Sequence, residues 1–150
     1  MTTRPHENKV EELTTAQCHE LLGTQVVGRL AVVEGEHPLV VPVNFAMSGG
    51  VVVVRTGEAL RARVDHRNVA FQVDHTERST RTGWSVLVQG LAEEVGDEHA
   101  ADLVERTRRT GVAPWAPGER EHWVRVIPHR VTGRRITSGG PWFADGSMYL

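Results

Sequence analysis

The chain has 150 residues, a formal net charge of −2 and a single cysteine, Cys18. That length suits one domain with its own core, and a lone cysteine excludes an internal disulfide and any CxxC zinc or redox motif. No run of about 18 apolar residues is present, which excludes a transmembrane helix. The charged N-terminus lacks the apolar segment of a secretory signal, so we expect a cytoplasmic protein with no membrane partner.

The basic residues are nearly all arginine, with sixteen arginines and one lysine, Lys9. The simplest explanation of most of this excess is codon usage in a GC-rich genome. Because 19 acidic residues balance the basic ones, no basic field for nucleic acid is expected. The abundance of valine, with 5% aromatic residues, favours β-structure.

The N-terminal part of the chain predicts a flexible arm followed by a short helix. Residues 1–12 are polar and are assigned to the arm. Thr14 is a suitable helix N-cap, and Gln17 follows three residues later in capping-box position. The pattern predicts a helix over residues 15–22 that ends at Gly23.

Three strand-like runs follow at residues 26–33, 39–47 and 51–56, separated by glycine-containing turns. Short runs at this spacing are typical of a β-meander. Pro42 lies inside the second run and has no backbone N–H to donate. It therefore predicts an edge position or a bulge there, a place where ligands often dock.

The remaining elements alternate between strands and short helices. Gly90 suggests a bulge or bend in a long strand, and Asp97 is the expected cap of the last helix. The tail over residues 138–150 has no clear period. The expected elements are a helix at 57–67, strands at 69–73 and 84–95, a helix at 97–110 and a strand at 122–136.

About six antiparallel strands and three short helices predict a mainly β protein of the α+β type. Hairpin-spaced strands with inserted helices fit a partly open β-barrel over residues 13–137, and they do not fit alternating βαβ units.

Several motifs that carry chemistry are absent from the sequence. There is no GxGxxG, no Walker A loop and no GxSxG elbow. None of the eight histidines forms HExxH or an i, i+4 pair, so no metal site is expected. Cys18 is expected to pack as a small apolar residue.

Arginines near one strand end suggest a site for an anion. Arg55 and Thr56 close the third strand, and Arg61 and Arg63 lie on the following helix. A phosphate there would meet helix N-terminal amides, a hydroxyl and guanidinium groups. The alternative is a set of solvated arginines on an exposed helix face.

Two further groups suit a flat aromatic ligand. Trp84 and Trp123 lie on strands and offer planar apolar surfaces. At Pro42, Val43 and Asn44, a proline-interrupted strand leaves backbone groups free to bond the edge of a heteroaromatic ring. The alternatives are core packing for the tryptophans and an ordinary edge strand.

Taken in order, these segments resemble the pyridoxamine 5′-phosphate oxidase-like flavoproteins, which are FMN-binding split β-barrels. The resemblance spans about residues 13–137. The segments that carry it are GRLAVV (28–33), PLVVPVNFA (38–46), VVVVRT (51–56), VAFQVD (69–74), GWSVLVQGLAEEV (83–95) and HWVRVIPHRVTGRRI (122–136).

The resemblance implies a homodimer with FMN bound at the subunit interface. Pro42, Val43 and Asn44 would run beside the isoalloxazine ring. Arg55 and Thr56 would hold the phosphate. The short bacterial branch of the family includes nitroimidazole-resistance-type reductases.

The long and the last strand would complete the site. Ser85, next to Trp84, matches the position where a polar residue approaches the flavin, and Trp123 and Arg125 match a late strand that contributes across the interface. Relatives carry a phosphate-binding lysine where this chain has Ala59, in a loop about two residues longer. Arg61 or Arg63 is the expected substitute.

The expected function is an FMN-dependent oxidoreductase acting on an unknown small molecule, with hydride passing to or from the flavin N5. No catalytic acid or base is evident in the sequence. The alternatives are a non-catalytic flavin-binding or ligand-sensing dimer, and a relative that uses the deazaflavin F420, whose anionic tail suits extra arginines.

Overall fold

The computed structural model describes residues 7–139, which form one seven-stranded antiparallel sheet with three short helices. The strand order is β1-β7-β4-β3-β2-β5-β6, and β6 also pairs with β7, which closes six strands into a barrel. The elements are β1 (Lys9–Glu12), α1 (Thr15–Leu22), β2 (Val27–Glu34), β3 (His37–Ser48), β4 (Val51–Thr56), α2 (Glu58–Val64), β5 (Arg67–Glu77), β6 (Thr82–Glu94), α3 (Ala101–Arg109) and β7 (His122–Thr137).

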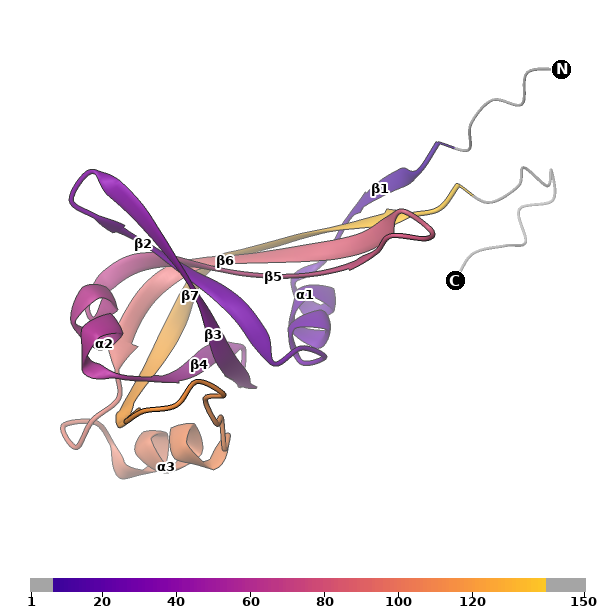
Figure 1. Cartoon of the computed structure of the whole chain (residues 1–150). Helices are drawn as coiled ribbons and strands as arrows, with labels where there is room; N and C mark the ends of the chain where they lie inside the picture. The colour runs from indigo at the N-terminus through magenta and orange to yellow at the C-terminus, as the bar shows by residue number, and fades with distance from the viewer. Residues whose placement is uncertain (1–6, 140–150) are drawn as a thin grey trace, which may run out of the picture.

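Strands β5, β6 and β7 continue beyond the barrel as a long arm, with β1 along the edge of β7 (Figure 1). The register of β6 against β7 shifts between Gln89 and Gly90, where barrel and arm meet. Gln89 lies opposite Arg130 and Gly90 opposite Pro128, which leaves His129 as an extra residue. The bend predicted from Gly90 is therefore confirmed.

The barrel interior is filled mainly by valines from the inward faces of the strands. Phe45 and Phe71 meet edge to face in this core, with ring centroids 4.9 Å apart. Gly28 makes room for them, because a Cβ there would lie 2.3 Å from the Phe71 ring. Leu22 and Cys18 of α1 also pack into the core; Cys18 is fully buried, which raises the pKa of its thiol.

Helix α1 begins with the predicted capping box. The Thr14 N–H donates to Gln17 Oε1 over 2.8 Å, and the Gln17 N–H donates to Thr14 Oγ1 over 3.2 Å. The helix ends at Leu22, as predicted. At the base of the arm, the Leu13 N–H donates to the Gly133 carbonyl over 2.9 Å, which ties the start of α1 to β7.

The structure corrects the predicted N-terminal arm. Lys9–Glu12 form β1 and pair with the end of β7, and residues 1–6 lie outside the described part. Glu11 lies opposite Arg135 and Glu12 opposite Arg134, so opposite charges face each other across the strands. This pairing supplies the seventh strand.

The predicted start of the third helix is also wrong. Helix α3 begins at Ala101, and Asp97 does not cap it. Instead, residues 96–99 form a turn in which the His99 N–H donates to the Gly96 carbonyl over 3.0 Å and the Gly96 N–H donates to His99 Nδ1 over 3.2 Å. Most of the predicted tail, residues 140–150, lies outside the described residues.

Within residues 7–139, no helix is long and apolar enough to cross a membrane.

Candidate functional site

The proline-interrupted strand lies at a partly unpaired stretch of the sheet. Pro42 pairs with Arg29 of β2, while β4 begins to pair with β3 only at Phe45. Residues 37–44 thus have a strand neighbour on one side only, as a proline requires. Side chains alternate between the two faces here, so Val43 points toward the barrel interior, where it packs on the core, while Pro42 and Asn44 face outward.

The side chain of Asn44 is engaged at both ends. Its Nδ2 donates to the Val26 carbonyl over 3.3 Å, and its Oδ1 accepts from the Trp115 N–H over 2.8 Å. Trp115 lies in the connection between α3 and β7. A ligand that used the Asn44 amide oxygen would compete with this hydrogen bond.

Arg55 and Thr56, expected to bind one phosphate, point to opposite faces of β4. Thr56 is buried, with 5% of its surface exposed, while Arg55 is exposed. The Arg55 guanidinium lies over the Trp123 ring, 5.3 Å from its centroid, and Arg55 Nε donates to the Arg120 carbonyl over 2.6 Å. Arg55 thus keeps an exposed cation at the strand end, next to Trp123.

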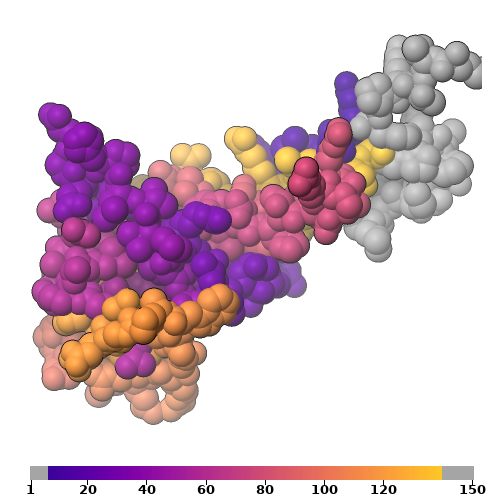
Figure 2. All heavy atoms as spheres, in the orientation of Figure 1, coloured from indigo at the N-terminus to yellow at the C-terminus, as the bar shows by residue number. Residues whose placement is uncertain are grey.

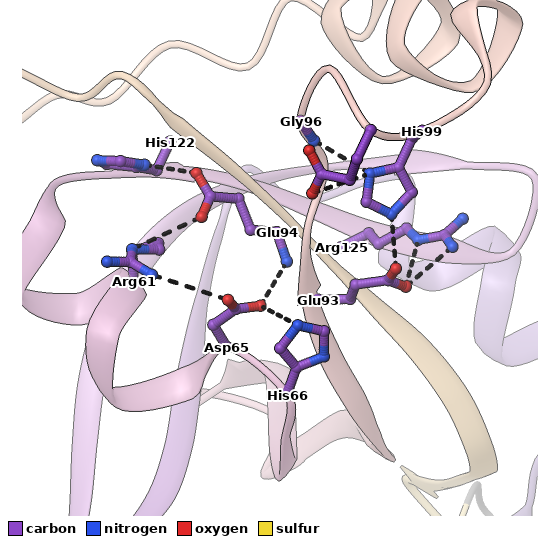
Figure 3. Close-up of polar contacts among 10 residues, drawn as sticks. Arg61, Asp65, His66, Glu93, Glu94, Gly96, His99, His122 and Arg125 are labelled. Carbon is purple, nitrogen blue, oxygen red and sulfur yellow. Dashed lines mark hydrogen bonds and ion pairs between the residues drawn. The ribbon is translucent and has the colours of Figure 1, made fainter.

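Arg61 is surrounded by three carboxylates, two of which, Asp65 and Glu94, are drawn in Figure 3. It pairs with Glu58, with Asp65 at 3.8 Å and with Glu94 at 3.6 Å. His122 joins the same cluster, with Nδ1 2.6 Å from Glu94 and Nε2 3.1 Å from Glu58. The hydrogen bond from Arg61 lowers the pKa of the Glu58 carboxyl, and Glu58 in turn raises the pKa of Arg61.

Arg63 is also paired, at 3.1 Å from Glu34. The two arginines expected to replace the missing lysine are thus each held by carboxylates of this chain. Ala59 occupies an exposed position on α2 and offers no charge.

Arg125 belongs to a second cluster, formed with Glu93 and His99 (Figure 3). Arg125 Nη2 lies 3.0 Å from Glu93, and His99 Nε2 lies 2.6 Å from Glu93. The hydrogen bond with His99 lowers the pKa of the Glu93 carboxyl, with a smaller effect from Arg125, and the same bond raises the pKa of His99. This cluster joins the end of β6 to β7 and to the turn before α3.

The Glu93–His99 pair predicts a stability that depends on pH. The raised pKa of His99 adds stability that is fully present below its unfolded pKa of 6.5 and is lost as pH rises through its folded pKa. The lowered pKa of Glu93 adds stability that is fully present above its unfolded pKa of 4.5 and is lost as pH falls through its folded pKa. We therefore expect His99→Gln to lower Tm most between those two values, and progressively less as pH rises through the raised pKa of His99. Thermal unfolding of both proteins across pH measures the difference, and a constant difference would contradict the assignment.

Trp84 and Ser85 lie on β6 where it enters the arm, and Trp84 also packs against the core. Trp84 sits opposite His75 on β5 and Arg135 on β7, and all three line a groove of about 960 Å³. Arg55 sits opposite Trp123 on the same β7. Arg29 pairs with Pro42 of β3 and with Gln72 of β5, and Gln72 pairs with Leu87 of β6, so Ser85 lies within about 20 Å of Pro42 across the strands.

The comparison with known families agrees with this architecture. The family model described as pyridoxamine 5′-phosphate oxidase matches residues 14–135. The chain belongs to the pyridoxamine 5′-phosphate oxidase family. The predicted resemblance and the split β-barrel fold are both confirmed.

Relatives of the chain include characterised structures and uncharacterised proteins. The uncharacterized protein Rv0080 of Mycobacterium tuberculosis is 33% identical over 137 residues, covering 87% of this chain and 88% of its own. An FAD-binding protein from Mycobacterium smegmatis is 34% identical with a TM-score of 0.70, covering 84% of this chain and 98% of that one. An FAD-binding protein from Mesorhizobium loti is 27% identical with a TM-score of 0.62, covering 87% and 99%.

Sequence reasoning missed several residues around this family's candidate site. Trp115 and Arg120 contact Asn44 and Arg55 from a loop, and Glu94 reaches Arg61 from the end of β6. The proline-flanked Trp115 was a usable signal, while the reach of Glu94 depends on strand register. Among the described residues, no group of three or more His, Cys, Asp or Glu side chains is arranged to hold a metal ion.

Proposed function

We propose that this member of the pyridoxamine 5′-phosphate oxidase family is a flavin-dependent oxidoreductase acting on a small molecule, with each site built from two copies of the chain. The observation that carries the proposal is the division of the candidate residues. Asn44 and Arg55 lie on β3 and β4 of the barrel, while Trp84 and Ser85 lie on β6 where it enters the arm. We place the arm of a second copy against the barrel of the first, so that its Trp84 and Ser85 complete the site.

The outer face of the β2–β3 hairpin supports this assembly. Val33 and Val40 are 60% and 57% exposed on strands that are direct neighbours, and Val27, 38% exposed, lies on the same face beyond Arg29 and Ala31. Contiguous exposed apolar side chains usually mark a contact surface. A homodimer that covers this hairpin removes the valines from water.

The described residues fit a flavin in part. The Pro42–Asn44 strand offers backbone groups beside an outward face, and Arg55 offers one exposed guanidinium. A bound flavin supplies the hydride transfer, while the chain binds and orients it. Trp84 and Trp123 offer planar surfaces that favour an aromatic substrate or the ring itself.

The charges favour FAD over the FMN predicted from the sequence. A terminal phosphate carries nearly two negative charges and needs several cations. Here Arg61 and Arg63 are paired with carboxylates, and Ala59 replaces the lysine. F420 depends on the same arginines for its anionic tail. FAD carries a similar total charge but spreads it as about one negative charge on each of its two phosphates, so no single group needs several cations. FAD also gains binding surface from its adenine, and two relatives are FAD-binding proteins.

A cofactor titration tests this proposal. The purified protein, freed of any bound cofactor, is titrated with FAD, FMN and F420 and followed by cofactor absorbance. We expect FAD to bind at least about tenfold more tightly than FMN, a difference of about 1.4 kcal/mol.

Reduction of the bound cofactor by NAD(P)H, followed by oxidation with quinones or nitro compounds, then measures turnover. If none of the three cofactors binds, the proposal fails; if FAD binds without turnover, the protein is a flavin-binding or ligand-sensing dimer instead.

A further inference from the structure

The connection between α3 and β7, residues 111–121, runs across the surface of the barrel and is here called the strap. Figure 2 shows it in orange along the face of the molecule. Its backbone makes hydrogen bonds to two candidate cofactor-binding residues. The Trp115 N–H donates to Asn44 Oδ1 over 2.8 Å, and the Arg120 carbonyl accepts from Arg55 Nε over 2.6 Å.

The strap also rests against the turn between β4 and α2. A Cβ at Gly57 would lie 3.2 Å from the Glu119 carbonyl oxygen and 3.2 Å from Arg120 Nη1. The backbone of the strap therefore approaches the strand end where an anion was predicted. The strap therefore contacts both Asn44, which suits the edge of a flavin ring, and Arg55, which suits a phosphate group.

The middle of the strap, residues 115–119, is exposed. The Trp115 side chain is 74% exposed, the largest exposure among the large apolar side chains of the described residues. The Trp115 N–H ties this residue to the barrel through its hydrogen bond to Asn44. Segments attached by exposed hydrogen bonds open at a lower free energy than the core does.

We propose that the strap is a gate over the flavin site. In the free chain it is hydrogen-bonded to Asn44 and Arg55, and it is displaced when a flavin nucleotide binds, which releases both side chains for the cofactor. This inference rests on the proposed function. Because only the form with an open strap binds the flavin, the apparent Kd equals the Kd of the open form divided by the fraction of molecules that are open.

Two variants at Trp115 isolate the hydrogen bond. Trp115→Pro removes both the indole and the N–H that Asn44 accepts, while the matched control Trp115→Ala removes the indole alone. The readout is tryptic cleavage after Arg120 in the strap, followed by mass spectrometry of the fragment. Without any cofactor, we expect cleavage of the proline variant to be about two- to tenfold faster than that of the alanine variant, the factor that one hydrogen bond typically represents. Equal Tm values for the two variants show that the barrel is intact in both.

The same variants then test the link to flavin. We expect the proline variant to bind FAD about two- to tenfold more tightly than the alanine variant, and saturating FAD to speed cleavage of the wild-type strap. Slower cleavage with FAD, or equal cleavage of both variants, would overturn the gate.

Hydrogen exchange provides a reading that needs no variant. The Trp115 amide should be protected in the free chain and should exchange faster when FAD is bound. Fast exchange in the free chain would overturn the gate even if Trp115→Pro does not fold. If the separate titration shows that FAD does not bind at all, the proposed function is refuted. The cleavage rates of the two Trp115 variants without cofactor would still show whether the strap is closed in the free chain.

Discussion

Gly90→Ala is expected to destabilise the protein by about 3 kcal/mol, lowering Tm by roughly 6–12 °C. A Cβ at this position would lie 2.0 Å from the Ile127 carbonyl oxygen and 2.8 Å from its carbon. These atoms belong to the backbone of β7 at the bulge, so relief requires movement of a strand that the whole barrel shares. Thermal unfolding followed by circular dichroism measures the loss.

Gly23→Ala is the matched control for this substitution. Gly23 has φ −64°, which any residue adopts, and the atom nearest to an added Cβ would be 3.4 Å away. We expect its Tm to stay unchanged or to rise slightly, because alanine has less backbone freedom in the unfolded chain. A loss at Gly23 as large as that at Gly90 would show that the close approach to Ile127 is not the cause.

Arg55→Ala is expected to raise the flavin Kd about 10- to 150-fold, since a charge-assisted hydrogen bond contributes about 1.5–3 kcal/mol. The same change releases one strap contact, which works in the opposite direction and limits the loss. Arg61→Ala is the control, because three carboxylates already hold that guanidinium. We expect its Kd to change little, and calorimetry on the three proteins measures the contrast. Equal losses for both variants would contradict the assignment of Arg55 as the exposed cation.

Mixing two variants extends this test to the assembly. Trp84→Ala should also weaken flavin binding, through the arm of the other copy. Dimers of one Arg55→Ala chain and one Trp84→Ala chain, purified by two different tags, have one intact site if each site combines both copies. We expect about one tightly bound flavin per mixed dimer and none in either parent. Equally weak binding in all three would show that the arm and barrel residues do not share a site.

Much of the fold could be predicted because its signals are local. The capping box at Thr14 and Gln17 marks the first helix to the residue, and Gly90 marks the bend between barrel and arm. β1 escaped prediction because its sequence, KVEE, lacks an apolar alternation. Its stabilising partners, Arg134 and Arg135, lie more than a hundred residues later, so the charge complementarity emerges only in the fold.

The candidate site was harder to predict than the fold. Sequence reasoning identified the arginines, but whether an arginine is available depends on what surrounds it in space. The Glu58–Arg61 pair, three residues apart on one helix, was readable from spacing. The contribution of Glu94 depends on where β6 ends against α2, and that of Arg120 on the path of a loop. Neither follows from local pattern.

The pairing of β1 with the end of β7 has a consequence for protein engineering. Lys9 lies opposite Thr137, so the described chain enters and leaves the fold as adjacent strands, about 5 Å apart. A short linker spans that gap, so the two ends of the described chain can be joined. The domain is thus suited to circular permutation and to insertion inside another polypeptide, where both junctions meet at one point.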